Sequence, residues 1–385
     1  MPQTEVSGGL ASTLPGRYYR DSAIFDLEQD RLFESYWFGF TNQFDVATPG
    51  QFRTGQVGKE NVIVIRGRDG RLRAFLNVCR HRGTRLCPQD HGQLKNTLRC
   101  TYHSWTYALD GKLVGGPHLA TMPDFDRDKY RLHQVHLREW LGYVWVCVAD
   151  EPPSFADTVV RTVTDRLGGP ERIHNWSVTD LQVGQRISYD VRANWKIIVE
   201  NFMECYHCPS IHPEFINVVT EFAKGYAAQH YVGRGMKFGE LAEGFTVDGA
   251  GGFGKLPGVT EEQDRSYFGI TINPQVFINL VPDHVIFHRM FPLTAERTIV
   301  ECDWLFSPDV VAASTDAADA GAAEHDISHS VELFHRINQQ DFAACEGCQV
   351  NMASRAYRDG GVLMPAEHHV RTAFLDWFET AIGPH

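Results

Sequence analysis

Two short segments, each with one cysteine and one histidine, constrain what this chain can fold into more than any other feature of its sequence. The first holds Cys79 and His81, and the second, after eighteen further residues, holds Cys100 and His103. The chain before them alternates β-branched runs with glycine-bounded turns, which predicts short paired strands, Asn61–Arg66 among them. Each segment is therefore predicted to be a tight loop between strands. Two such loops can together present four ligands to one metal centre.

Two kinds of metal centre use cysteine with histidine. Zinc binds both in tetrahedral sites, but zinc fingers usually begin with two closely spaced cysteines, and one cysteine with one histidine in each loop fits that pattern poorly. A Rieske [2Fe-2S] centre needs two thiolates on one iron and two imidazoles on the other. Cys79, His81, Cys100 and His103 supply that set. We therefore predict one [2Fe-2S] cluster per chain.

A second informative stretch runs from Asn194 to Phe215. Its apolar residues recur at steps of three or four, as on an amphipathic helix, and a polar stripe that includes Glu204 runs beside them. The stretch continues to His207 and His212, with Pro209 between them. Since proline bends or ends a helix, we expect the two imidazoles to turn toward one another. The pair is a candidate metal site, although a structural pair is the commoner case.

A buried carboxylate far along the chain supplies a third candidate ligand. Residues 325–358 show the apolar periodicity of a long helix, and Asp341 lies on its apolar stripe, between Ile337 and Cys345. An unpaired buried carboxylate costs several kcal/mol or more, so Asp341 must pair with a cation, either an arginine or a metal ion. Two histidines and one carboxylate form the facial triad of non-haem Fe(II) oxygenases. We predict that His207, His212 and Asp341 hold one Fe(II) per chain.

Composition and charge exclude several classes of protein. The 43% hydrophobic and 22% charged content is ordinary for a soluble globular chain, and the net charge of −12 argues against nucleic-acid binding. No apolar run approaches the length of about 18 residues that a membrane span needs, and no export signal precedes the fold, so a cytoplasmic location is expected. There, the nine cysteines should be metal ligands or core residues rather than disulfides.

The order of the patterns predicts three parts. Residues 1–38 form an N-terminal arm and helix, residues 39–150 a domain of short strands, and residues 151–385 a second domain that begins at the helix-breaking Glu151-Pro152-Pro153. In the last part, four segments alternate apolar and polar residues, which predicts an antiparallel sheet and an α+β fold. These segments are residues near Tyr231, 275–280, 285–291 and 298–306.

The motifs resemble those of Rieske non-haem iron oxygenase α (catalytic) subunits. The cluster motif C-R-H-R-G-x-R-L-C with C-x-Y-H-x-W-x-Y-x-L-D-G spans Cys79–Gly111, and the catalytic motif E-N-x-x-E-C-Y-H-C-x3-H-P spans Glu200–Pro213. The third-ligand segment N-x-Q-D is Asn338–Asp341. The resemblance continues from the L-P-G-x-Y-Y opening at Leu14 to the C-terminal helix.

This resemblance implies an all-β Rieske [2Fe-2S] domain before a helix-grip catalytic domain with a central antiparallel sheet. It implies a homotrimer in which the cluster of one subunit feeds the iron of the next. O2 is then a co-substrate, and NAD(P)H supplies electrons through a separate flavin/iron-sulfur reductase. Glu204 stands where most ring-hydroxylating relatives carry aspartate, and it is implied to be the inter-subunit electron-transfer bridge between His103 of a neighbouring subunit and His207.

The sequence indicates the substrate less directly than it indicates the metal sites. Glu204 within E-C-Y-H-C resembles the branch that oxidises quaternary ammonium compounds such as glycine betaine, stachydrine and carnitine. A methylated ammonium offers no hydrogen-bond donor and binds aromatic faces. Five aromatic residues are candidates for such a cage, although each also suits a core: Phe202, Tyr206, Phe277, Phe287 and Trp304.

We predict hydroxylation of an N-methyl group of this small-molecule substrate, with release of formaldehyde. The alternative is an aromatic ring-hydroxylating or O-demethylating Rieske oxygenase, which would share both metal sites. An electron-transfer Rieske protein would explain residues 40–150 but not the set His207, His212 and Asp341.

Overall fold

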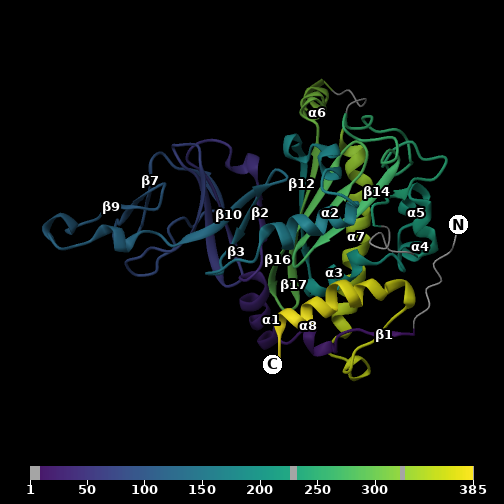
Figure 1. The fold of residues 1–385 in the computed structure, drawn as a ribbon, viewed down its shortest axis with the longest axis horizontal. Helices are drawn as coiled ribbons and strands as arrows, with labels where there is room; N and C mark the ends of the chain where they lie inside the picture. Colours follow the sequence, from purple (N-terminus) through teal and green to yellow (C-terminus); the bar gives the residue numbers. More distant parts are fainter. Residues whose placement is uncertain (1–8, 226–231, 321–325, 385) are drawn as a thin grey trace. The chain divides into compact units, whose positions relative to one another are not determined.

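The computed structural model describes residues 9–225, 232–320 and 326–384, and the chain divides into two compact units. Residues 29–155 form one unit, and the residues up to Glu28 join residues 156–385 in the other. Figure 1 shows the helices and strands of both in sequence colours. The first part of the chain is thus built into the unit that contains the second half of the sequence.

The unit of residues 29–155 is built from two antiparallel sheets. Seven strands pair in the order β2-β11-β10-β5-β4-β3-β6, and three pair in the order β7-β8-β9. The first sheet contains β2 (Phe38–Asn42), β3 (Gln51–Val57), β4 (Glu60–Arg66), β5 (Leu72–Leu76), β6 (His91–Gln93), β10 (Gln134–Trp140) and β11 (Tyr143–Cys147). The second contains β7 (Thr97–Arg99), β8 (Thr106–Ala108) and β9 (Leu113–Gly115).

Glycine makes the turn between β8 and β9 possible. Gly111 has a φ of +82°, in the left-handed region that L side chains rarely adopt, and its N–H donates to the carbonyl oxygen of Ala108 at 2.9 Å. A Cβ at Gly111 would also lie 2.6 Å from the ring of Phe75. The hairpin therefore closes against the core of its own unit.

The other unit is organised around a six-stranded antiparallel sheet in the order β12-β17-β16-β15-β14-β13. Its strands are β12 (Gln182–Val191), β13 (Met236–Lys237), β14 (Ser266–Ile272), β15 (Val276–Leu280), β16 (Val285–Thr294) and β17 (Arg297–Phe306). The alternating segments 275–280, 285–291 and 298–306 correspond to β15, β16 and β17, so that prediction is confirmed. The segment near Tyr231 lies outside the described residues.

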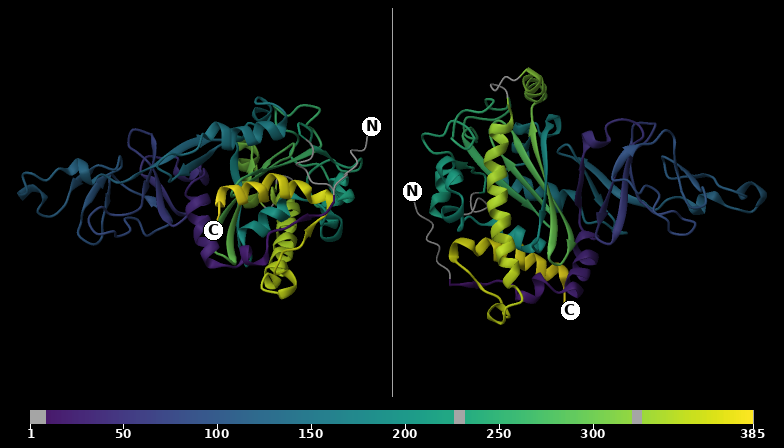
Figure 2. Two further views of the ribbon diagram at one scale, coloured as in Figure 1. Left: turned by 60° about the horizontal axis from the view of Figure 1, so that its bottom comes forward. Right: turned by 180° about the vertical axis from the view of Figure 1, so that it is seen from behind.

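Helices pack against this sheet. The longest, α7 (Ser328–Asn351), runs along one face of it (Figure 2) and buries Phe334 and Ile337 in a core with Ile286 and Trp304. The other helices of this unit are α1 (Ser22–Glu28), α2 (Arg161–Leu167), α3 (Trp195–Met203), α4 (Cys208–Ile211), α5 (Pro213–Val218), α6 (Pro308–Ala320) and α8 (Asp376–Ile382). The predicted α+β fold, a domain of strands together with a helix-covered antiparallel sheet, is confirmed.

A buried ion pair fastens the N-terminal helix to α3. The ammonium of Lys196 contacts a carboxylate oxygen of Glu28, and the indole N–H of Trp195 donates to its other oxygen at 2.7 Å. Both charged side chains are fully buried. Since removing either partner would leave an uncompensated buried charge, residues 22–28 are an integral part of this unit. Within the described residues, no helix is long and apolar enough to cross a membrane.

Candidate metal centres and substrate pocket

The two cysteine–histidine loops of the strand-built unit have the same backbone closure. The N–H of Cys79 donates to the carbonyl oxygen of Thr84, and the N–H of Cys100 donates to that of Trp105, both at 2.8 Å. Each loop thus reverses the chain within six residues and presents its cysteine and histidine at the turn. The sequence-predicted tight loops are present.

The four side chains lie in two loops of the same unit and differ in burial. Both thiols are buried, with Cys79 and Cys100 each 2% exposed, whereas the rings of His81 and His103 lie together, 4.7 Å apart between centroids. Nδ1 of His103 is buried and has no hydrogen-bond partner among the described residues. A buried ring nitrogen without a partner fits a metal ligand. The donor set of two thiolates and two imidazoles fits a Rieske cluster.

The sulfur atoms are surrounded by hydrogen-bond donors. Tyr107 Oη accepts the N–H of Arg80 at 3.0 Å and lies 3.5 Å from Sγ of Cys79, to which it would donate when Cys79 is a thiolate, since a thiolate only accepts. Burial opposes ionisation of Cys100, but the backbone N–H groups of Tyr102 and His103 lower the pKa of this thiol below its ordinary value. A thiolate is the form that binds iron.

The stretch 194–215 differs from the single bent helix we expected. Helix α3 begins after Asn194, whose side chain accepts the N–H of Lys196 at 2.9 Å, and it ends at Met203. Glu204 is already extended, and Pro209 stands near the start of α4 rather than at a break. The chain bends earlier because the carboxylate of Glu204 accepts local backbone N–H groups and offers the backbone an alternative to the helix.

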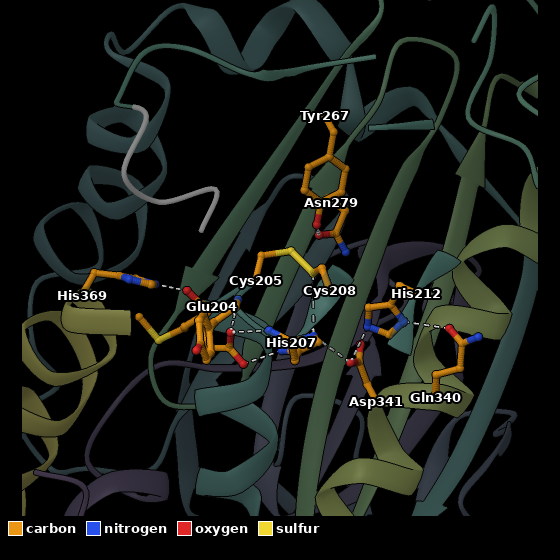
Figure 3. Close-up of a disulfide and its surroundings, with 12 residues drawn as sticks. Glu204, Cys205, His207, Cys208, His212, Tyr267, Asn279, Gln340, Asp341 and His369 are labelled. Atoms are coloured by element: carbon orange, nitrogen blue, oxygen red, sulfur yellow. Dashed lines mark hydrogen bonds and ion pairs between the residues drawn. A yellow bond between two sulfur atoms is a disulfide. The ribbon is translucent and has the colours of Figure 1, made fainter. Parts of the chain in front are cut away.

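Glu204 folds back on the first histidine of the pair. Its Oε2 accepts the backbone N–H of Tyr206 and that of His207, the latter at 3.3 Å, while Oε1 contacts Nδ1 of His207 (Figure 3). Because a carboxylate only accepts, Nδ1 of His207 carries the proton. Nε2 of His207 is then left to bind a metal.

The second histidine is held in the same way from a different element. Nδ1 of His212 lies 2.7 Å from Oε1 of Gln340 on α7, and Nε2 of Gln340 donates to Glu214 at 3.4 Å. The second contact commits the amide nitrogen of Gln340 to donation, so its oxygen accepts from Nδ1 of His212. Nε2 of His212 is therefore left to face Asp341, with a proton when no metal is bound, as it is in His207.

The two Nε2 atoms converge on Asp341. Oδ1 of Asp341 lies 2.9 Å from Nε2 of His212 and 3.3 Å from Nε2 of His207. Ligands on neighbouring corners of a metal with bonds of about 2.1 Å lie roughly 3 Å apart, which both distances match. His212 and Asp341 are 1% and 4% exposed, so a cation held here would be shielded from water. Two imidazoles and one carboxylate with open positions fit mononuclear iron.

The electrostatics of the three groups are those of a cation site. Burial alone would raise the pKa of Asp341, but the bonds from His207 and His212 lower it to about 2. Burial would likewise lower the pKa of His207, and its contacts with Asp341 and Glu204 raise it instead, to about 10. The surrounding carboxylates thus favour positive charge at the point where the histidines meet. A divalent cation bound there would replace a proton.

A disulfide next to these histidines corrects our expectation for the cysteines. Cys205 and Cys208 are bonded, with their Cα atoms 4.9 Å apart. The extended turn after Met203 brings the two residues within the span of a disulfide. Although Cys208 lies with His207 and His212 in one cluster of possible ligand atoms, a disulfide sulfur carries no thiolate charge. Asp341 is therefore the anionic candidate ligand that contacts both histidines.

A pocket opens beside the three candidate ligands. Six aromatic side chains contribute to its wall, together with Asn201, Thr271 and Asn279. The aromatic residues are Phe202, Phe215, Phe222, Tyr267, Phe277 and Phe334. Among the described residues that line it, the formal charges belong to Glu204, Asp341 and the two histidines, and no lysine or arginine takes part.

The pocket contains two of the five aromatic residues that we considered from the sequence. Phe202 and Phe277 line it and stack on each other, with their ring centroids 4.5 Å apart. In contrast, Tyr206 is 52% exposed, and Phe287 and Trp304 are fully buried in the sheet. These three are not among its described lining residues, so we no longer consider them as substrate contacts.

Sequence reasoning missed several residues of this site. Gln340 is the residue before Asp341 and was visible in the N-x-Q-D motif, although nothing in the motif indicated its bond to His212. Asn279 lies on β15, where alternation with apolar residues predicted a strand and not a pocket wall, and Tyr267 lies on β14, for which the sequence pattern predicted no strand. Their hydrogen bond, at 2.6 Å, had no local signal.

These features define a class of protein. A unit that presents two thiolates and two imidazoles, and another that presents two imidazoles and a carboxylate, carry the donor sets of an oxygenase with a Rieske cluster and a mononuclear iron. Residues 36–126 match the Rieske [2Fe-2S] domain, and residues 178–383 match the family of ring-hydroxylating α subunits, catalytic domain. The chain belongs to this family of Rieske oxygenase α subunits, which are oxidoreductases. A [2Fe-2S] cluster and mononuclear iron are its expected cofactors, and a reductase is its required partner.

Named relatives are similar over nearly the whole chain. The glycine betaine monooxygenase oxygenase subunit of Chromohalobacter salexigens is 30% identical over 397 residues, covering 95% of this chain and 85% of the relative. The carnitine monooxygenase oxygenase subunit of Acinetobacter baumannii is 30% identical over 367 residues, covering 92% and 89%. A solved structure of a quaternary ammonium Rieske monooxygenase matches with a TM-score of 0.74 at 23% identity, covering 100% of this chain and 99% of that one.

Proposed function

We propose that this protein hydroxylates an N-methyl group of a quaternary ammonium compound, a betaine-type substrate, and so removes that methyl group as formaldehyde. The relatives named for glycine betaine and carnitine support the substrate class. The proposal further takes His207, His212 and Asp341 as the ligands of the mononuclear iron, and Cys79, His81, Cys100 and His103 as the ligands of the cluster.

The composition of the pocket wall carries the proposal. Six aromatic rings surround a space whose only formal anions, among the described lining residues, are Glu204 and Asp341. A methylated ammonium has no N–H to donate, and it is attracted to π faces by up to about 2 kcal/mol when it is desolvated. The lack of a lysine or arginine in the described wall removes the repulsion that such a cation would otherwise meet. A substrate with a positive methylated head therefore suits this pocket.

The reaction balances with the electrons that a reductase provides. One N-methyl group of the quaternary ammonium substrate, one molecule of O2, two electrons and two protons give an N-hydroxymethyl group and one molecule of water. The hydroxymethyl product then breaks its C–N bond, and the electron pair stays on nitrogen. The products are a tertiary amine, formaldehyde and one proton.

The chain's own residues orient the parts of this reaction. The iron, when bound, supplies the activation of O2. Glu204 and Gln340 keep the Nδ1 protons of His207 and His212 in place, so that both Nε2 atoms point to the metal position. The aromatic wall directs the cationic head of the substrate and excludes water. Asp341 contributes the single anionic ligand.

We also propose that Glu204 transfers electrons between subunits of a homotrimer. Its contact with Nδ1 of His207 supports this role, because one carboxylate can bind His207 and still be 12% exposed on its side chain. A flavin/iron-sulfur reductase that oxidises NAD(P)H is the proposed donor. Mass measurement of the assembly in solution, with and without the reductase, tests the trimer and the partner separately.

The function is tested by product analysis over a substrate panel. The iron-loaded protein is incubated with NADH and a generic flavin/iron-sulfur reductase, and formaldehyde and the demethylated amine are quantified together. The panel contains glycine betaine, stachydrine, carnitine and choline, with aromatic acids and methoxyarenes as the other arm. Equal yields of formaldehyde and amine from a quaternary compound are expected. Product from the aromatic arm alone would instead establish the ring-hydroxylating or O-demethylating alternative.

A further inference from the structure

A chain of polar side chains crosses the apolar core from the pocket wall to helix α7. Tyr267 Oη lies 2.6 Å from Oδ1 of Asn279, and Nδ2 of Asn279 lies 3.4 Å from Nδ1 of His288. Nε2 of His288 lies 3.2 Å from Oδ1 of Asn338, and Nδ2 of Asn338 lies 3.4 Å from Oη of Tyr189. The last contact is from Tyr189 Oη to Nδ1 of His335, at 2.7 Å.

The chain runs through a region from which water is excluded. Asn279, His288 and Asn338 are 2%, 0% and 0% exposed. Aromatic rings enclose His288, with the centroid of Phe202 at 5.1 Å and that of Phe334 at 5.5 Å. Buried polar groups depend on each other for hydrogen bonds. If one of these connected side chains rotated alone, it would lose a hydrogen bond and place two donors opposite each other.

The hydrogen bonds of the chain all point one way. An amide nitrogen only donates, so Nδ1 of His288 accepts from Asn279, and the single proton of the neutral ring sits on Nε2 and is donated to Asn338. Burial keeps the imidazole neutral, because it lowers the pKa of His288 to about 4. Asn338 in turn donates to Tyr189, whose hydroxyl proton is then donated to His335. At the other end, Tyr267 donates to Asn279.

The direction of the chain decides what Tyr267 presents to the pocket. Its hydroxyl proton is committed to Asn279, so its oxygen offers only lone pairs to other neighbours (Figure 3). Burial raises the pKa of Tyr267 well above its ordinary value, which keeps that proton in place. The ring of Tyr267 lines the pocket with Phe215, 5.6 Å away between centroids.

We propose that Tyr267 is a specificity-determining residue that selects a positively charged N-methyl head, and that His288 is a positioning residue that fixes the direction of the Tyr267 hydroxyl through Asn279. The inference rests on the proposed function and adds the residues that select the head group. Methyl hydrogens on a cationic nitrogen carry partial positive charge, so they are attracted to oxygen lone pairs and to the π faces of aromatic rings. An uncharged head of the same shape lacks that attraction.

Binding measurements on matched pairs of ligands test the inference without turnover. Glycine betaine is compared with 3,3-dimethylbutyrate, and choline with 3,3-dimethyl-1-butanol, since each pair differs only in nitrogen or carbon at the centre of the head. Titration calorimetry on the iron-loaded holoenzyme gives the ratio of the two dissociation constants. Wild-type protein is expected to bind the cation of at least one pair more tightly.

Two kinds of variant test separately the presence of the Tyr267 oxygen and the orientation of its hydroxyl group. Tyr267→Phe removes the oxygen alone, and His288→Leu removes the acceptor of the Asn279 amide together with the bond from His288 to Asn338. Each is expected to reduce the ratio roughly fivefold to tenfold, where tenfold corresponds to about 1.4 kcal/mol. His288→Gln keeps one acceptor and one donor and is expected to stay within about threefold of wild type. His284→Leu, which removes another fully buried imidazole, is the control and should leave the ratio unchanged.

Several results would overturn the inference. An unchanged ratio in Tyr267→Phe does so whatever the His288 variants do, so the test survives poor folding of His288→Leu. A further decrease of the ratio when His288→Leu is added to Tyr267→Phe would also overturn it, because His288 would then act without the Tyr267 oxygen. Wild-type protein that demethylates quaternary compounds but binds the isosteres equally well refutes this inference alone. Protein that neither binds nor oxidises any cation of the panel refutes the proposed function as well.

Discussion

Oε1 of Gln340 accepts a hydrogen bond from Nδ1 of His212 at 2.7 Å, and the next residue of the same helix, Asp341, lies 2.9 Å from Nε2 of that imidazole. Two consecutive residues of α7 therefore contact the two nitrogens of one ring. The first fixes the position of the ring proton and the second meets its other nitrogen. The position of α7 along the sheet thus sets the geometry of the proposed iron site.

Replacing Gln340 by leucine should weaken iron binding without unfolding the protein. Loss of the acceptor frees the His212 ring to rotate. Loss of such a partner typically costs about 10- to 100-fold in metal affinity, and we expect a decrease of roughly that size here. Titration of the mononuclear iron against a chelator measures the effect. Gln339→Leu, at the exposed neighbouring position, is the matched control. Equal affinities in both variants would contradict the role of Gln340.

Replacing Asp341 by asparagine should remove one metal and keep the other. The change deletes the only anionic group of the set while His207 and His212 remain, so the site loses the charge that a divalent cation needs. Iron per chain should fall from about three to about two, with the optical and EPR signals of the [2Fe-2S] cluster intact. Asp359→Asn, on the exposed surface, should retain about three. Full iron content in Asp341→Asn would exclude this carboxylate as a ligand.

Substitution of Glu204 by alanine should separate metal content from turnover. The imidazole of His207 loses its partner at Nδ1, which should weaken iron binding as in Gln340→Leu, yet both ligand sets remain, so both metals should stay bound in excess iron while substrate oxidation falls by roughly 100-fold. Product formation with reductase is measured beside iron content, with Glu240→Ala as an exposed control. Normal turnover of Glu204→Ala with native iron content would refute the electron-transfer role.

The hydroxyl of Tyr107 should tune the cluster. It lies 3.5 Å from Sγ of Cys79 and would donate to that sulfur as a thiolate, and a hydrogen bond to a cluster sulfur stabilises the more negative, reduced state. Tyr107→Phe should therefore lower the reduction potential by on the order of 60 mV, which for one electron equals about 1.4 kcal/mol. Protein-film voltammetry measures the shift. Tyr130→Phe, whose ring stacks on Phe125 at 4.8 Å, should leave the potential unchanged.

Glu200 should make stability depend on pH in the direction opposite to an ordinary carboxylate. Burial raises its pKa from 4.5 to about 7, although Tyr19 donates to its Oε1 at 2.8 Å. Between these two pKa values the folded state binds more protons than the unfolded state. The contribution of Glu200 to the free energy of unfolding is therefore fully present below about pH 4.5 and is lost as the pH rises to about 7.

Glu200→Gln, which resembles the protonated carboxyl, should flatten that part of the profile. The free energy of unfolding of the variant relative to wild type should increase by on the order of 2 kcal/mol between pH 4.5 and 7. Denaturant titrations at fixed pH values give the two profiles. Glu171→Gln, at an exposed position, should follow wild type. Parallel profiles for Glu200→Gln and wild type would show that Glu200 keeps an ordinary pKa.

Sequence reasoning succeeded for loops and strands that are encoded by neighbouring residues. Cys79 with His81, and Cys100 with His103, sit in loops whose hydrogen bonds close within six residues, so their spacing already limits what they can bind. Period-two alternation of apolar and polar residues likewise predicted β15, β16 and β17, although the structure buries β15 along its whole length. The prediction of a helix bent at Pro209 was wrong for residues 203–209. There the carboxylate of Glu204 ends α3 before the proline, and Cys205 forms a disulfide with Cys208.

The sequence by itself determined which candidate groups are present: four candidate cluster ligands, a histidine pair, a carboxylate on a buried helical stripe, and the family motifs that contain them. Only the tertiary structure decided which of these meet. Asp341 joins His207 and His212 because α7 packs along the sheet, and Tyr267 reaches α7 through Asn279, His288 and Asn338 on separate elements. Such contacts depend on the packing of segments far apart in the chain, and local periodicity carries no record of that packing.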